Sequence, residues 1–360
     1  LNTSNNVALK MARGKYIMRL DADDFLAPQA VEVMTAELER NSDVALVFPD
    51  YYFVDEDGEI IQQVRRHDFE SDVTLLDQPA HGACTMIRTD VLRTVGGYDQ
   101  DFTCQDGFDL WLNITSQYPI RNINLPLFFY RQHGNNLTID EKTLLETRGK
   151  IKAKQVKRRD LEPLSVLVII PTRGEKIDPR STPLRKLDNK ALIDWTIDSA
   201  LVSELVTDII VTTPDGATIE YVNKKYSNRI LTHLRNEELG KINTAIEETA
   251  KDVVDIYKAS HPEPEVLLIL YIEYPFRSAF YIDKAINTLR LYDVDVVDGV
   301  RSEDDIFYVH RGQGLEPWRN SRKMRLERDE LYRRTGGIQL LKTSVLSTGK
   351  DIIEGKIGHI

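Results

Sequence analysis

The chain has 360 residues, 41% of them hydrophobic and 29% charged, which is typical of a globular protein long enough for two domains. Its formal net charge of −10 argues against a nucleic-acid surface or an anionic membrane as the main partner. Cys84 and Cys104 are the only cysteines, which excludes a disulfide framework and predicts a reducing, cytoplasmic setting. No apolar run approaches the ~18 residues that a membrane span needs.

Helix and strand patterns alternate through the first part of the chain. We predict helices at 7–12, 28–40 and 106–118, strands at 16–20, 44–48, 83–88 and 127–131, and a hairpin at 51–64. A short helix after residue 88 is predicted to stop at Gly96-Gly97. Residues 142–159 are helical in pattern and strongly basic, which indicates a solvated linker or, alternatively, a phosphate- or polymer-binding segment.

The alternation begins again at residue 164 with an almost wholly apolar run, typical of a central parallel strand. Helices are predicted at 191–201, 217–226, 241–260 and 278–291, and strands at 208–212, 266–271 and 294–300. We therefore predict the α/β class with two Rossmann-like doubly wound domains, covering residues 1–141 and 164–360 on either side of a linker at 142–163.

An acidic segment, Leu20-Asp21-Ala22-Asp23-Asp24, closes the predicted strand at 16–20. Carboxylates in such a cluster repel one another unless a cation lies among them. Oxygen ligands suit Mg²⁺ or Mn²⁺, the ions that accompany the phosphates of nucleotides. The segment thus indicates a metal site, and the alternative is a solvated acidic turn that caps the next helix.

The acidic segment is one of several motifs that occur in a fixed order. The others are Asn6, Ala12, Gly14 and Tyr16-Ile17 before it, and Gly96-Gly97-Tyr98-Asp99, Gln105-Asp106, Asp109-Leu110-Trp111-Leu112 and Tyr130-Arg131-Gln132-His133 after it. Together they resemble the central signature of family-2 glycosyltransferases with the GT-A fold, over roughly residues 1–140.

That resemblance implies roles for four residues. Asp21 would lie near the ribose and metal of a nucleotide-sugar donor, and Asp23 would bind the metal ion that bridges its phosphates. Asp106 would be the catalytic base for the hydroxyl of a glycan acceptor. His133 would join the metal ligands. The family begins with a strand and loop that bind the nucleotide base, which nothing before Leu1 supplies, so we expect a longer parent protein or a remnant domain.

The later motifs resemble those of cytidylyltransferases that make CMP-activated acidic sugars. The motifs are Pro171 to Lys176, Pro179-Arg180, Ala191 to Ile197, Ile210 to Asp215 and Leu331 to Ile338. The resemblance implies that the triphosphate of CTP is bound by Gly174, Arg173, Lys176 and Arg180, with Arg173 and Lys176 catalytic. It places Thr212 and Asp215 against cytosine or ribose.

Several positions depart from this second family, among them Glu175 beside the proposed triphosphate and the segment from Tyr271 to Tyr274. The charged loop residues have an alternative interpretation as solvated side chains. Residues 164–172 also resemble the start of a family-2 enzyme, which leaves a single circularly permuted glycosyltransferase as another alternative.

The predicted function is that of a bifunctional sugar enzyme for surface polysaccharide or glycoconjugate synthesis. One half transfers a sugar from a nucleotide-sugar to a glycan acceptor with Mg²⁺ or Mn²⁺, and the other activates an acidic sugar with CTP. Neither nucleic acid nor an integral membrane segment is expected, and a homodimer is expected because relatives of the second domain are often dimers. The alternative is a nucleotide- or glycan-binding protein in which one or both domains lack activity.

Overall fold

The computed structural model describes residues 1–65, 79–132, 141–303, 307–310, 312, 314–318, 331–348 and 355–360. The chain divides into two compact units, Leu1–Ile151 with Asp305–Asp329, and Lys152–Asp304 with Glu330–Ile360. The division falls within the basic helix α5 (Glu141–Arg158). None of the helices in the described ranges is both long and apolar enough to cross a membrane.

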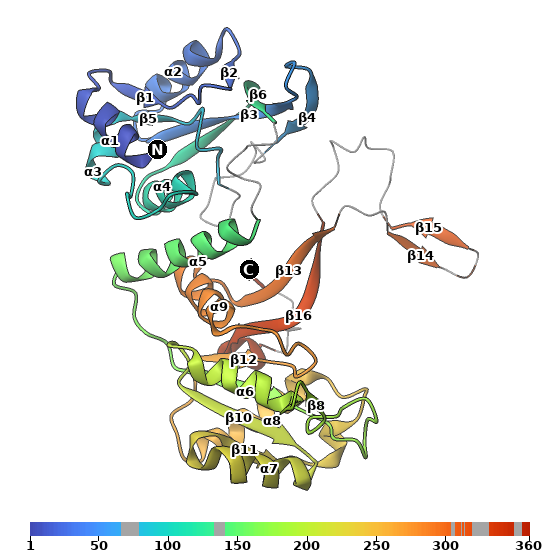
Figure 1. The fold of residues 1–360 in the computed structure, drawn as a ribbon. Helices are drawn as coiled ribbons and strands as arrows, with labels where there is room; N and C mark the ends of the chain where they lie inside the picture. The colour runs from blue at the N-terminus through green and yellow to red at the C-terminus, as the bar shows by residue number, and fades with distance from the viewer. Residues whose placement is uncertain are drawn as a thin grey trace. The chain divides into compact units, whose positions relative to one another are not determined.

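The first unit is built on a six-stranded mixed sheet with the order β1-β5-β3-β6-β2 and with β4 paired to β3 (Figure 1). Its strands are β1 (Tyr16–Met18), β2 (Phe25–Leu26), β3 (Leu46–Val54), β4 (Ile60–Val64), β5 (Met86–Arg88) and β6 (Ile120–Arg131). β3 and β6 are parallel, and the other described pairs are antiparallel.

Four helices accompany this sheet: α1 (Asn2–Met11), α2 (Ala30–Arg40), α3 (Thr89–Thr94) and α4 (Asp106–Thr115). α2 buries one stripe of side chains, spaced four residues apart, in a core cluster with Val47. On the next residue of β3, the ring of Phe48 makes an edge contact with Trp111 of α4, at 5.4 Å between centroids. Because successive strand residues point to opposite faces, α2 and α4 cover opposite faces of the sheet.

The second unit has a seven-stranded sheet with the order β11-β10-β7-β12-β16-β13-β17. Its strands are β7 (Val166–Pro171), β10 (Asp208–Thr213), β11 (Leu231–Leu234), β12 (Val266–Ile269), β13 (Val296–Glu303), β16 (Leu331–Lys342) and β17 (Ile357–His359). β11, β10, β7 and β12 are parallel, whereas β16 is antiparallel to both of its neighbours. A short ladder pairs β8 (Lys186–Leu187) with β9 (Lys190–Ala191) in this unit. Another pairs β14 (Tyr308–His310) with β15 (Leu315–Pro317), in the segment that belongs to the first unit.

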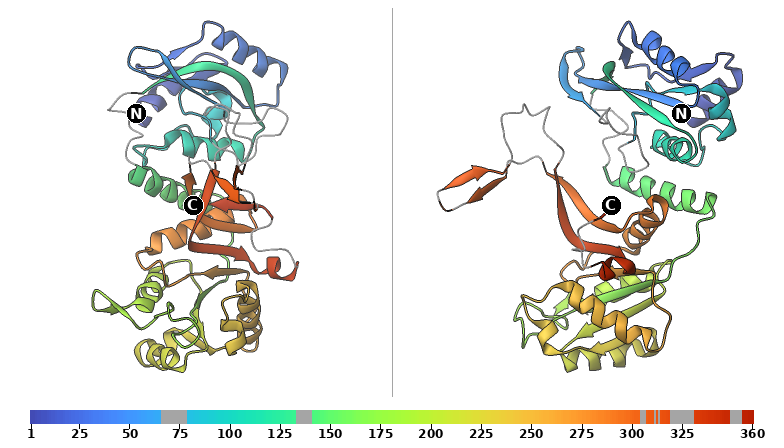
Figure 2. Two further views of the ribbon diagram at one scale, coloured as in Figure 1. Left: turned by 90° about the vertical axis from the view of Figure 1, so that its right-hand side faces the viewer. Right: turned by 180° about the vertical axis from the view of Figure 1, so that it is seen from behind.

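Helices cover both faces of this second sheet. They are α6 (Leu192–Val202), α7 (Gly216–Tyr226), α8 (Ile246–Lys258) and α9 (Ala279–Tyr292), with single 3₁₀ turns at Ser227–Arg229, Glu237–Gly240 and Thr343–Ser347. α8 lies on the face opposite α6 (Figures 1 and 2) and packs Val253 into a core cluster with Leu167 and Ile169 of β7. All six residues of β7 are buried, as the continuous apolar run predicts for a central parallel strand.

The predicted α/β class is confirmed, and each unit has a sheet of its own. The permuted single-domain alternative is excluded because β7 lies inside the second sheet and pairs with β10 and β12. A continuous parallel run of strands is found in the second unit, whereas the described pairs of the first are mostly antiparallel.

Several predicted elements differ from the structure. β3 runs without a break through the gap between the predicted strand at 44–48 and the hairpin, because the residues on both sides of Pro49 are buried. The helix predicted at 241–260 is wrong in its first part, since α8 begins at Ile246 after a separate 3₁₀ turn. The pattern did not predict β11 or β16, since both have polar residues at several positions.

Candidate functional site

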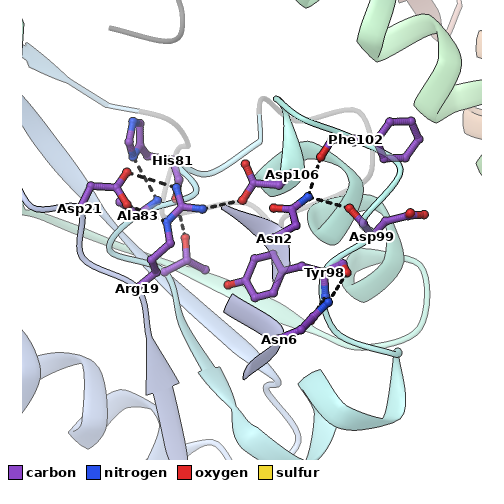
Figure 3. A network of polar contacts seen from close by, with 11 residues as sticks. Asn2, Asn6, Arg19, Asp21, His81, Ala83, Tyr98, Asp99, Phe102 and Asp106 are labelled. Carbon is purple, nitrogen blue, oxygen red and sulfur yellow. Dashed lines mark hydrogen bonds and ion pairs between the residues drawn. The ribbon is translucent and has the colours of Figure 1, made fainter. Parts of the chain in front are cut away.

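One arginine joins the two carboxylates that the sequence singled out in the first unit (Figure 3). Arg19 Nη1 lies 2.5 Å from Asp106 Oδ2. The same guanidinium contacts Asp21 through Nε, at 3.0 Å from Oδ1, and through Nη2, at 3.3 Å from Oδ2. The structure therefore brings Asp21 and Asp106 to either side of a single cation, although sequence reasoning had not identified Arg19.

The backbone around Arg19 leaves space for its guanidinium. Arg19 directly follows β1, and its carbonyl accepts a hydrogen bond from the Cys84 amide at 2.8 Å. A Cβ placed on Gly82 would lie 3.1 Å from Arg19 Nη2, and a Cβ on Gly107 would lie 2.9 Å from the Cα of Gly82. Two glycines, one in the loop before β5 and one at the start of α4, thus allow the close approach that the ion pairs need.

Opposite charges hold this arrangement together in a mostly buried place. The side chains of Arg19, Asp21 and Asp106 are 15%, 33% and 11% exposed, so the pairs are shielded from solvent more than surface ion pairs are. Burial lowers the pKa of Arg19, but the charges of Asp106 and Asp21 outweigh it and raise that pKa above its ordinary value. Asp106 is the first residue of α4, where the helix dipole also favours a negative charge.

Two asparagines of α1 hold the loop that leads to Asp106. Asn6 Nδ2 donates to the Tyr98 carbonyl at 2.7 Å, and the Tyr98 amide donates to Asn6 Oδ1 at 2.9 Å. Asn2 Nδ2 donates to the carbonyls of Asp99 and Phe102 (Figure 3). Together these bonds attach residues 98–102 to α1, which explains why the family-like motif contains Asn6 so far from Asp106 in sequence.

The rest of the acidic segment faces different surroundings. Asp23 is exposed, and its carbonyl accepts a hydrogen bond from Arg131 Nε at 3.0 Å. Asp24 is buried, and its Oδ1 accepts a bond from the Arg131 amide at 2.9 Å. Burial raises the pKa of Asp24 to about 6. His133, the third predicted metal ligand, lies outside the described residues.

Asp21 and Asp23 are the described side chains that the sequence analysis assigned to a metal ion. Within the described residues, no group of three or more His, Cys, Asp or Glu side chains is arranged to hold a metal ion. Mg²⁺ in nucleotide enzymes is commonly held by one or two carboxylates together with phosphate oxygens. Asp21 and Asp23 offer such carboxylates, with Asp21 in this structure paired to Arg19.

In the second unit, the loop after β7 is organised around a buried acid that sequence reasoning did not select. Asp178 Oδ1 accepts bonds from the amide and from Nε of Arg180, at 3.1 and 3.2 Å, and its Oδ2 lies 3.3 Å from Arg173 Nη1. The bonds from Arg180, followed by the contact with Arg173, lower the pKa of Asp178. Arg180 remains largely exposed, as do Lys176 and Glu175.

Gly174 and Asp215, both predicted to bind the nucleotide, lie in close contact with each other. Gly174 has φ +77°, and a Cβ there would lie 2.6 Å from the Cβ of Asp215, so this close approach requires glycine. The Asp215 carboxylate accepts bonds from the Ala217 amide at 3.2 Å and from the Thr218 hydroxyl at 2.6 Å, and so caps α7. The Thr212 hydroxyl is buried and contacts His233 Nδ1 at 3.1 Å.

The most unusual cation of the second unit is Arg235, which directly follows β11. Its side chain is buried, with the residue 5% exposed, and Nη2 donates to the Thr172 carbonyl at 2.7 Å. Nε and Nη1 have no hydrogen-bond partner in the described structure, and neither has the buried hydroxyl of Thr172. Burial, and then the nearby charge of Arg173, lower the pKa of Arg235 to about 10.

Arg235 lies at the carboxyl edge of the parallel strands, where open α/β sheets bind ligands. A buried guanidinium with two unused donor nitrogens is costly unless an anion supplies the acceptors. Sequence reasoning missed it because β11 itself was not predicted. The sequence marks it only weakly, as an arginine at the end of a short run in which Thr232 and His233 lie between apolar residues.

A second set of buried polar groups lies where β16 departs from regular pairing. Gln339 is fully buried, and neither polar atom of its amide has a partner in the described ranges. Its register partner Asp298 lies 2.9 Å from Arg334 Nε, across the irregularity at this point of the β13–β16 ladder. Tyr274 covers the same segment, since a Cβ on Gly336 would lie 2.7 Å from its hydroxyl.

Comparison with known proteins places the first unit in a class. The sequence model described as "Glycosyltransferase like family 2" matches residues 1–157. The chain is 30% identical over 139 residues to an uncharacterized glycosyltransferase of Methanocaldococcus jannaschii, covering 36% of this chain and 46% of that one. It is 25% identical over 139 residues to a chondroitin synthase of Escherichia coli, covering 39% and 20%.

Residues 1–157 are therefore a glycosyltransferase-like domain of the family-2 type, in agreement with the prediction from the ordered motifs. The chain spans less than half the length of either of these relatives.

Among solved structures, similarity is found to cytidylyltransferases. A 4-diphosphocytidyl-2C-methyl-D-erythritol synthase of Anaerococcus prevotii is 16% identical with a TM-score of 0.41, covering 55% of this chain and 86% of that chain. A CMP:2-keto-3-deoxy-manno-octonic acid synthetase in complex with CTP is 16% identical with a TM-score of 0.38, covering 51% and 76%.

Proposed function

We propose that the first unit transfers a sugar from a nucleotide-sugar donor to a hydroxyl of a glycan acceptor. The observation that carries this proposal is the placement of Asp106 and Asp21 on either side of Arg19, within a domain that matches the family-2 glycosyltransferases. Asp23, an exposed acid two residues after Asp21, would supply a further oxygen ligand to a metal ion at the diphosphate of the donor.

In the proposed reaction, Asp106 accepts the proton of the acceptor hydroxyl as its oxygen forms a bond to the anomeric carbon. The bond from that carbon to the nucleoside diphosphate breaks at the same time, and the diphosphate leaves with the bonding electrons. Asp23 and Asp21 would hold a Mg²⁺ or Mn²⁺ ion, which when bound would supply positive charge to the leaving diphosphate. Arg19 places a cation beside the Asp106 carboxylate, at 2.5 Å from its Oδ2.

The test is donor turnover with Mn²⁺ across a panel of UDP-, GDP- and CMP-sugars, for the wild type and for Asp23→Ala and Asp106→Asn. Each substitution is expected to lower kcat by at least about 100-fold. Asp43→Ala, at an exposed acid of the same unit, is the matched control and should leave turnover unchanged. Equal turnover in wild type and Asp23→Ala would end the proposal.

For the second unit, we propose that it binds CTP and activates an acidic sugar to its CMP-sugar. The main support is Arg235, which lies near Arg173 at the carboxyl edge of the parallel strands. Its Nε and Nη1 have no hydrogen-bond partner in the described chain. Phosphate oxygens of a triphosphate are acceptors of the right charge for these donors. Gly174, which follows Arg173 in the same loop, leaves room for the side chain of Asp215.

Two measurements test this second proposal. Calorimetry with CTP and Mg²⁺ should show binding that is lost in Arg235→Met and retained in Arg229→Met, where an exposed arginine is replaced. Pyrophosphate release should then require an acidic sugar, for which 3-deoxy-manno-octulosonate and N-acetylneuraminate are the first probes. Binding of CTP without release of pyrophosphate with any acidic sugar would favour the alternative, a nucleotide-binding module without chemistry. The exposed Glu175 beside the phosphate loop motivates that alternative.

A further inference from the structure

The contacts of Arg19 assign it a role beyond charge neutralisation. We propose that Arg19 is a positioning residue for sugar transfer, which holds the Asp106 carboxylate at a fixed place relative to the donor-side carboxylate of Asp21. This inference rests on the proposed transferase function of the first unit. Arg19 itself would not touch the reacting atoms and acts through Asp106.

The shape of the guanidinium supports this role. Nη2 donates a hydrogen bond to Asp21 Oδ2, and Nη1 donates one to Asp106 Oδ2. Nε lies 3.0 Å from Asp21 Oδ1 as an ion-pair contact without a hydrogen bond. Because the guanidinium is planar and rigid, the two carboxylates are fixed relative to each other as well as to the arginine. A lysine in the same place would supply the charge from a single nitrogen and cannot reproduce this geometry.

The surroundings leave little freedom for another arrangement. The Arg19 side chain is 15% exposed, and the space next to Nη2 is bounded by Gly82, where even a Cβ would lie only 3.1 Å away. The ring of Tyr98 lies beside the ion pairs, on a loop that α1 holds through Asn6 (Figure 3). The position of Asp106 is thus set from both sides, by its loop and by Arg19.

The expected consequence is a loss in the chemical step rather than in donor binding. Without Arg19, the Asp106 carboxylate is free to rotate away from the acceptor hydroxyl, and a displacement of about 1 Å in a catalytic group can cost about 100-fold in rate. We therefore expect Arg19→Gln to lower kcat by about 10- to 100-fold while the KM for the donor changes less than about threefold. Arg19→Lys should recover part of the rate, because it keeps the charge.

A double-variant comparison separates a positioning role from an independent one. If Arg19 acts through Asp106, adding Arg19→Gln to Asp106→Asn should lower kcat no further than Asp106→Asn alone. Lys15→Gln, which removes a cation from an exposed ion pair with Glu39 in the same unit, is the control and should leave kcat unchanged. Multiplicative losses in the double variant, or a change confined to KM, would overturn the inference.

A crystal structure tests the positioning role of Arg19 independently of the proposed transferase activity. In a crystal structure of the full chain carrying Arg19→Gln, the Asp106 carboxylate should have left its wild-type position while α4 and β1 remain in place. An Asp106 side chain unmoved in that variant overturns the positioning role, whatever the activity. Absence of turnover in the wild type with every donor would instead reject the transferase proposal and leave the structural result to decide the role of Arg19.

Discussion

Replacing Arg235 with methionine gives the sharpest test of the second unit, because stability and ligand binding are expected to change in opposite directions. Methionine has similar length and no charge, so it fills the same buried space. In the wild type without ligand, the guanidinium is buried with two of its nitrogens unpartnered in the described structure. Without ligand, the variant should therefore be the more stable protein.

The size of the effect follows from the pKa. Burial and Arg173 lower the pKa of Arg235 from 12.5 to about 10, which disfavours the charged form by roughly 3 to 4 kcal/mol. Against this, the variant loses the bond from Nη2 to the Thr172 carbonyl, which contributes about 1.5 kcal/mol. The net gain is about 2 kcal/mol, which raises the melting temperature of the second unit by roughly 4 to 8 °C.

With CTP bound, the wild type should be the more stable of the two proteins. An anion that pairs with the buried guanidinium is worth about 2 kcal/mol or more, so CTP should bind at least about 30-fold more weakly to Arg235→Met. Differential scanning calorimetry with and without CTP and Mg²⁺ measures both effects, with Arg229→Met as the exposed control. A variant less stable than the wild type without CTP would refute the claim that this charge is unsatisfied. Unchanged CTP binding would refute its role as the anion ligand.

Two further predictions concern buried positions. Burial raises the pKa of Cys84 to about 12, so the thiolate fraction at pH 8 is about 10⁻⁴. Its rate of alkylation should therefore rise about tenfold for each added pH unit. Peptide mass spectrometry after iodoacetamide treatment at pH 8 should find the partly exposed Cys104 modified well before Cys84, and equal labelling would contradict the burial of Cys84. In Gly174→Ala, the new Cβ would lie 2.6 Å from that of Asp215 at a φ of +77°, so the free energy of unfolding should fall by about 1 to 3 kcal/mol. The control is Gly216→Ala, where nothing lies within 4 Å of the added Cβ, and its free energy of unfolding in a urea titration should change by less than about 1 kcal/mol. Equal losses in the two variants would contradict the claim that Gly174 is needed for the close approach to Asp215.

Local patterns were sufficient for the main elements of the chain. The periodic spacing of apolar residues predicted most helices and strands. The continuous apolar run at 164–170 predicted the central strand β7. The acidic segment was recognisable because Asp21, Asp23 and Asp24 are neighbours in sequence, and its order relative to Asp106 indicated a glycosyltransferase-like domain, which the family match supports. Such signals are local because helix and strand periodicity depends on side chains only a few residues apart.

Tertiary structure alone decided which of these groups meet. Arg19 and Asp106 are 87 residues apart, and Arg235 reaches the carbonyl of Thr172 across 63 residues. These contacts depend on strand order and on where loops cross the edge of a sheet, and neither is encoded in local spacing. The burial of the Gln339 amide was likewise evident only in the structure. Burial depends on the packed fold, and glutamine is mostly an exposed residue, so the sequence did not predict it.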